Sequence, residues 1–134
     1  MLTYETNCSA PPERAWELLA RPDRWARWAP HLRGARGLGA PEVDPGARGA
    51  VMFLGIVPVP ARVVAKRPGR SWSWDVGGVR IDHRVEPRAS GCTIAIDLEA
   101  PPPLEAILRV SYGPLVALLV RNLARVAERG AAGG

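Results

Sequence analysis

The sequence predicts an α+β domain in which an antiparallel sheet curves around a long C-terminal helix. Three observations support this fold class. Residues 2–8 alternate like a strand, residues 32–98 combine frequent Pro and Gly with apolar side chains at every second position, and helical apolar spacing runs from about Pro103 to Arg129. A sheet that grips such a helix leaves space between the two layers, where a small apolar molecule can bind.

The N-terminal part predicts one strand followed by two short helices. Leu2–Cys8 alternates apolar and polar side chains with the period of a half-buried strand. Ser9 is expected to cap a helix that ends near Ala20, because Ser is a favoured N-cap residue and the prolines that follow are tolerated in a first turn. A second short helix is expected at residues 23–28, and its two tryptophans, three positions apart, share one face.

Six further strands are expected in the middle of the chain, because Gly and Pro recur there too often for a helix. Their expected ranges are Arg33–Leu38, Ala50–Leu54, Val59–Arg67, Ser71–Val76, Val79–Pro87 and Cys92–Glu99. Gly77 and Gly78 form a two-residue hairpin signal, and residues 88–91 form a longer turn. Consecutive hairpins predict an antiparallel meander.

The C-terminal part returns to helical spacing after the stiff Pro101–Pro103 connector. The apolar positions that repeat at this spacing are Leu115, Leu118, Leu119, Leu123 and Val126. The arginines at positions 121, 125 and 129 form an exposed stripe on the same helix. Residues 129–134 are expected to be a frayed tail, and the chain from 1 to 134 is interpreted as one domain.

Composition argues against several functional classes. The net charge is +5, but the arginines are spread among acidic residues and Lys66 is the sole lysine, so no nucleic-acid surface is expected. No apolar stretch approaches the roughly 18 residues of a membrane span, and no secretory signal is evident, so a cytoplasmic location is expected. Cys8 and Cys92 lack metal-ligand spacing, and no nucleotide-binding loop occurs, so we expect neither metal nor cofactor.

Several segments carry a family likeness. They are Ala10–Ala20, Trp25-x-x-Trp28, Trp72-Ser73-Trp74, Asp82-His83-Arg84-Val85 and Asn122-Leu123-Ala124-Arg125. Together they resemble the SRPBCC or START-like superfamily, and within it the branch named for polyketide cyclases, dehydrases and lipid-transfer domains. The resemblance covers the whole chain and implies a helix-grip fold of the birch-pollen-allergen type. In that fold seven antiparallel strands surround the C-terminal helix and leave a cavity for a lipid, a polyketide or another hydrophobic ligand.

The resemblance also implies that the first and last strands pair. Tyr4 would then lie opposite Ile96, and Cys8 opposite Cys92 on the same face of the sheet. In a reducing compartment we expect both cysteines to be small buried side chains rather than a bridge.

Strand alternation predicts which side chains face the helix. An interior that holds Trp72, Trp74, His83 and Tyr112 offers flat apolar walls with a few polar tips, as ligand pockets do, although tryptophans also simply fill cores. The residues expected to contact a ligand are Trp28, Phe53, Val63, Trp72, Trp74, Ile81, His83, Ile94, Ile96, Tyr112, Leu115 and Leu119.

Three functions stay open at this point. The first is a non-catalytic carrier or sensor of a small hydrophobic molecule. The second is a polyketide cyclase or dehydratase in which His83 or Tyr112 moves protons, since an ordinary imidazole pKa of about 6.5 suits general acid–base work. Asp82 cannot form a dyad with His83, because neighbouring strand residues point to opposite faces. The third is a protein-interaction module, and both a monomer and a homodimer remain open.

Overall fold

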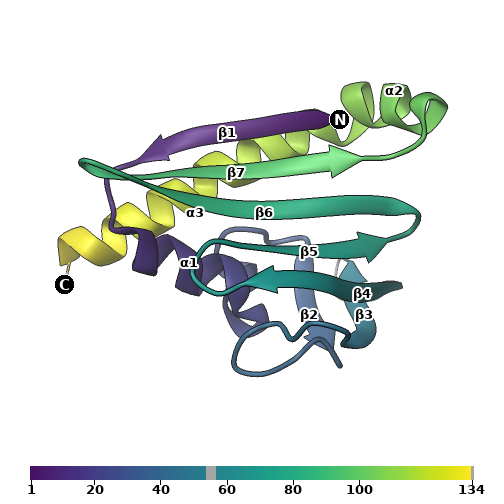
Figure 1. Cartoon of the computed structure of the whole chain (residues 1–134), viewed down its shortest axis with the longest axis horizontal. Helices are drawn as coiled ribbons and strands as arrows, with labels where there is room; N and C mark the ends of the chain where they lie inside the picture. Colours follow the sequence, from purple (N-terminus) through teal and green to yellow (C-terminus); the bar gives the residue numbers. More distant parts are fainter. Residues whose placement is uncertain (54–56, 134) are drawn as a thin grey trace.

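Seven antiparallel strands form one curved sheet in which the first strand lies beside the last (Figure 1). The structure is a computed structural model that describes residues 1–53 and 57–133. The strands are β1 (Leu2–Cys8), β2 (Leu32–Arg36), β3 (Arg48–Phe53), β4 (Val57–Arg67), β5 (Ser71–Val76), β6 (Val79–Arg88) and β7 (Gly91–Glu99). Their order across the sheet is β1-β7-β6-β5-β4-β3-β2, so the expected meander and seven-stranded sheet are confirmed.

The strand ends differ from the predicted ranges by a few residues. β4 begins at Val57 rather than Val59, because β3 pairs with it across both Pro58 and Pro60. Proline keeps the extended backbone that a strand needs, although it donates nothing to the ladder. The predicted strand end at Leu54 lies outside the described residues.

The helices are α1 (Pro12–Ala20), the 3₁₀ helix η1 (Pro22–Arg27), α2 (Pro102–Ser111) and α3 (Gly113–Gly133). Both α1 and α3 lie behind the sheet in Figure 1, on its inner face. The N-cap of α1 is Pro11 and makes no side-chain cap bond, so the prediction of Ser9 as the cap is wrong. The Ser9 hydroxyl instead donates to Glu128 of α3 at 3.1 Å, which ties the start of α1 to the C-terminal helix.

The C-terminal segment is two helices rather than the single long helix that was expected. α2 and α3 are bent by 59° at the Tyr112–Gly113 junction. Pro114 accounts for the break, because its ring would clash with the carbonyl four residues earlier in a continuous helix. Gly113 leaves room for the Tyr4 hydroxyl, which would lie 2.0 Å from a Cβ at this position and would have to shift.

The fraying expected from residue 129 onward stays a prediction. α3 continues to Gly133, so helix covers most of the segment from residue 129 onward. Its backbone ladder simply extends the buried helix by one more turn, despite the low helix propensity of glycine.

Among the described residues, no single helix combines the length and apolar character that crossing a bilayer requires. α2 and α3 have the necessary length and apolar character only when they are taken together, and they are bent by 59° where they meet.

The pairing of β1 with β7 follows the predicted register. Tyr4 lies opposite Ile96 and Cys8 opposite Cys92, as the resemblance implied. Both cysteines are free and buried, and burial raises the pKa of the Cys92 thiol to about 12. The Cys8 thiol donates to the carbonyl of Ala124 in α3 at 3.7 Å. This bond from β1 to Ala124 helps to hold α3 against the sheet at the end away from α2.

Candidate functional site

Stacked aromatic rings fill the space between η1, β5 and β6. Trp72 stacks on Trp25 with ring centres 5.6 Å apart and planes at 4°, and on His83 with centres 3.9 Å apart and planes at 9°. Trp74 meets Trp25, Trp72 and His83 edge-on, with centres 5.2, 5.1 and 5.8 Å away. Edge-to-face and offset stacking are the favoured arrangements of aromatic pairs, so these four rings form one rigid unit.

Two indole N–H groups of this unit, and that of the neighbouring Trp28, are bonded to the end of α1. Trp25 and Trp72 both donate to the carbonyl of Leu19, at 3.0 and 3.1 Å, and Trp28 donates to the carbonyl of Leu18 at 2.9 Å. The last carbonyls of a helix have no intrahelical partner, and Pro22, four residues after Leu18, has no N–H to offer. The indoles satisfy carbonyls that would otherwise be buried and unpaired.

A small cavity lies between the aromatic unit and α3. Its volume is about 40 Å³. The residues that line it are Trp28, Leu32, Trp74, Ile81, His83, Ile96, Leu98, Tyr112, Val116 and Leu119. Roughly 15 Å³ is enough for one water molecule, whereas a pocket for a drug-sized ligand needs about 300–1,000 Å³. The interior is thus nearly filled in this conformation.

The cavity brings together most of the side chains predicted to contact a ligand. Those that line it are Trp28, Trp74, Ile81, His83, Ile96, Tyr112 and Leu119. Others lie elsewhere in the core: Trp72 is inside the aromatic stack, Val63 and Ile94 are fully buried, and Leu115 is half-buried on α3. The side chain of Phe53 lies outside the described part of the chain.

Three lining residues were missed by the prediction. Leu98 follows Ile96 on the inward face of β7, so strand alternation could have identified it. Val116 is four residues after Tyr112 and three before Leu119, which is the spacing of one helix face. No local pattern in the sequence identifies Leu32 as a lining residue, because its position depends on how β2 lies against the rest of the molecule.

His83 is the first polar group at the cavity. Its Nδ1 lies 3.1 Å from the carbonyl oxygen of Trp72. A carbonyl only accepts, so Nδ1 carries the proton and Nε2 keeps a lone pair. Burial lowers the pKa of His83 to about 4, with the Trp72 carbonyl and the charge of Asp97 opposing that shift. The ring is therefore neutral at pH 7.

Trp74 and Tyr112 are the other polar groups. The Nε1 of Trp74 is buried and has no hydrogen-bond partner among the described residues, unlike the indoles that cap α1. Burial raises the pKa of the Tyr112 phenol, whose ring centre is 6.5 Å from that of His31. All ten lining residues are uncharged at pH 7. The cavity thus offers a few neutral hydrogen-bonding groups on apolar walls.

α2 forms the end of the molecule next to this cavity. Tyr112 is the C-cap of α2 and also lines the cavity, so the helix is attached directly to the cavity wall. None of the ten residues of α2 is buried, and Ile107 and Val110 are 59% and 78% exposed. Figure 1 shows α2 beyond the end of β7, near the N-terminus. There the Met1 amine pairs with Glu105 at 2.8 Å.

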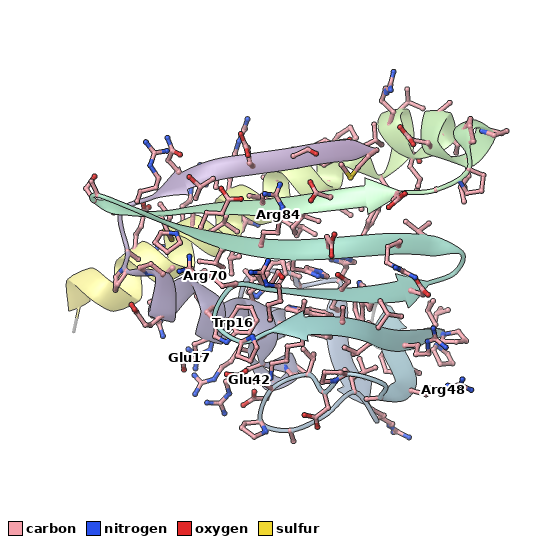
Figure 2. The ribbon with its side chains drawn as sticks, in the orientation of Figure 1. Trp16, Glu17, Glu42, Arg48, Arg70 and Arg84 are labelled. Atoms are coloured by element: carbon pink, nitrogen blue, oxygen red, sulfur yellow. The ribbon has the colours of Figure 1, made fainter. Side chains whose placement is uncertain are left out.

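The opposite face of the sheet is charged and internally paired. Figure 2 shows Arg84 on the face turned away from α3, where its Nε lies 2.9 Å from the carboxylate of Asp97. Beside α1, the indole of Trp16 donates to Glu42 at 3.2 Å, and Lys66 pairs with the same carboxylate at 3.0 Å. These polar groups have partners within the protein, so the unsatisfied indole of the cavity is the stronger candidate for ligand contact.

The family model described as polyketide cyclase / dehydrase and lipid transport matches residues 2–131. No curated protein matches the chain at a significant level.

Solved structures of low sequence identity share the fold. A crystal structure of a protein from Nitrosomonas europaea has a TM-score of 0.79 at 14% identity, and covers 98% of this chain and 96% of that one. A Polyketide_cyc-like protein from Corynebacterium glutamicum has a TM-score of 0.65 at 16% identity, with 96% and 91% covered. A putative protein of the dynemicin biosynthetic locus has a TM-score of 0.72 at 23% identity, with 97% and 48% covered.

Proposed function

Because the chain belongs to the polyketide cyclase, dehydrase and lipid transport family, we propose that it binds a small, mostly apolar molecule between the sheet and α3 and acts as a carrier or sensor without catalysis. The observation that carries the proposal is the position of the cavity. Its walls are apolar and aromatic, it lies between the two layers, and Tyr112, the C-cap of α2, is part of its lining.

The volume of about 40 Å³ requires that the cavity expand when a ligand enters. α2 is the element that can move at the smallest cost, because it buries no side chain fully, whereas α1 buries five. Tyr112 joins α2 to α3, so a displacement of α2 withdraws Tyr112 from the cavity wall. The exposed Ile107 and Val110 then remain available to contact an apolar ligand as it passes.

The polar groups favour binding over proton transfer. A pKa of about 4 makes His83 a weak base, and its Nδ1 is already engaged by the Trp72 carbonyl. An efficient general acid or base has a pKa near the working pH. The raised pKa of Tyr112 keeps its hydroxyl protonated, so it can donate a hydrogen bond but is a poor base at pH 7. Neither group supports the cyclase alternative as the main function.

A plugging variant tests the proposal. Val116→Phe adds bulk inside the cavity, and Leu118→Phe adds similar bulk on the same helix at a side chain that is 48% exposed. The probe is N-phenyl-1-naphthylamine, a neutral molecule whose fluorescence rises in apolar surroundings. We expect binding to the wild type and to Leu118→Phe, and an affinity about tenfold lower for Val116→Phe, since the added ring occupies space that the probe needs.

Two outcomes would contradict the proposal. One is equal binding by both variants, which would place the probe outside the cavity. The other is no binding to the wild type while circular dichroism shows that it is folded.

A further inference from the structure

One indole of the aromatic unit lacks the acceptor that its neighbours have. Trp25, Trp28 and Trp72 each donate to a carbonyl of α1, whereas the Nε1 of Trp74 is buried without a partner among the described residues. Trp74 is 5% exposed and lines the cavity. A buried donor without a partner is costly, so an acceptor atom placed in the cavity would stabilise the protein.

His83 supplies the complementary group. Its Nδ1–H is held by the sheet backbone, at the Trp72 carbonyl, which places Nε2 at the other side of the ring. The lone pair of Nε2 can therefore accept from a donor, while the buried indole of Trp74 needs an acceptor. The two ring centres are 5.8 Å apart and both residues line the cavity, so one polar atom of a ligand can lie next to both rings.

The lining of the cavity favours an uncharged oxygen. None of the ten lining residues is Lys, Arg, Asp or Glu. A carboxylate entering the cavity would lose its hydration without meeting a cation, and it could not donate to His83. A ketone accepts from Trp74 but leaves His83 without a donor. A hydroxyl both accepts and donates, and it does so without charge.

We infer that the ligand of this cavity carries a neutral hydroxyl, as in an alcohol, a phenol or an enol, which accepts from Trp74 Nε1–H and donates to His83 Nε2. This inference rests on the proposed function and narrows it, because it separates hydroxylated apolar molecules from free fatty acids and other carboxylates. The apolar walls provide the affinity for the hydrocarbon part, and the two rings select the polar group.

A matched series of probes tests the inference by isothermal titration calorimetry at pH 7. The probes are 1-naphthol, naphthalene and 1-naphthoate, which share one ring system and differ in the polar group. We expect naphthol to bind about tenfold more tightly than naphthalene, as one well-formed buried hydrogen bond allows. We expect naphthoate to bind at least tenfold more weakly than naphthol, because its charge is unpaired.

Two variants test whether Trp74 donates a hydrogen bond to the hydroxyl. Trp74→Phe keeps an aromatic ring and removes the donor, so the preference for naphthol over naphthalene should shrink, because only the bond to His83 is left. Trp28→Phe is the matched control, because Trp28 lines the same cavity but its N–H already serves Leu18. It should change naphthol and naphthalene by the same factor.

The indole signals in a ¹H–¹⁵N spectrum give a direct readout. The chain has 5 tryptophans, and the signal lost in Trp74→Phe identifies Trp74. That signal should move downfield with naphthol and not with naphthalene. An unmoved Trp74 signal, equal affinity for naphthol and naphthalene, or tighter binding of naphthoate would overturn the inference and leave cavity binding intact. Failure of all three probes to bind would contradict the proposed function, and the inference with it.

Discussion

α1 and α2 are short helices of similar length that are held in opposite ways. α1 has nine residues and buries five of them, while α2 has ten and buries none. The end of α1 is bonded by indole N–H groups, whereas α2 is attached through Tyr112, the half-buried Leu108 that packs against the core, and an ion pair at Glu105. The comparison shows that the fixed contacts lie at one end of the cavity and that the weakly held element lies at the other.

The difference follows from where the apolar side chains can go. In α1, Trp16, Leu18 and Leu19 are buried, and the chain leaves the helix into η1, where Trp25 continues the core. In α2, the bend at Gly113 carries the helix past the sheet edge, so Ile107 and Val110 have no layer to pack against. Exposed apolar residues on a weakly packed helix beside a cavity are consistent with α2 moving away to let a ligand enter.

The largest expected effect concerns the fixed end. Trp72→Ala removes a fully buried ring that stacks on two others and an N–H that satisfies the Leu19 carbonyl. We expect the free energy of unfolding to fall by about 3–5 kcal/mol in denaturant titrations. A loss below about 1 kcal/mol would show that the aromatic unit does not hold α1.

The second expected effect is a dependence of stability on pH. The pKa of His83 is about 4 in the folded state against an ordinary value of 6.5, so between these values the unfolded chain binds more protons. The contribution of His83 to the free energy of unfolding is therefore fully present above pH 6.5. It is lost as the pH drops towards 4, by about 3 kcal/mol in total.

A variant isolates this contribution. His83→Phe keeps a ring in the stack and cannot titrate, so the difference between the wild type and the variant should change by that amount between pH 6.5 and 4. A constant difference across this range would mean that His83 is not buried in the neutral form.

The smallest expected effect concerns the weakly held end. Val110→Ala on α2 removes a side chain that is 78% exposed. We expect the free energy of unfolding to change by no more than about 0.5 kcal/mol, as for other surface substitutions. If Val110→Ala destabilises the protein as much as Trp72→Ala does, the contrast between the two helices is wrong.

Much of the fold could be predicted from the sequence because strand alternation and hairpin turns are local signals. The opposition of Tyr4 and Ile96 came instead from the family resemblance, because local alternation does not show which distant strands pair. Alternation gives the direction of a side chain but not what it meets. Trp72 and Trp74 both point inward, yet Trp25 and Trp28 from η1 and its end decide that one is enclosed in a stack and the other borders the cavity.

Other features depend on contacts that no local pattern records. The acceptors for the indoles of Trp25 and Trp72 are carbonyls on another element, so their satisfaction and the lack of a partner for Trp74 become visible only in three dimensions. The cavity volume depends on every neighbouring side chain at once. The break at Pro114 had a signal in the sequence, but the strong apolar spacing on both sides of it favoured one continuous helix.

Hydrogen exchange measured by mass spectrometry tests most directly whether α2 opens while the rest of the molecule stays folded. We expect amides of Pro102–Ser111 to exchange much faster than those of Pro12–Ala20, and saturating 1-naphthol to slow the exchange of α2. Exchange of both helices at one common rate, unchanged by the probe, would mean that α2 moves only on global unfolding and would contradict the account.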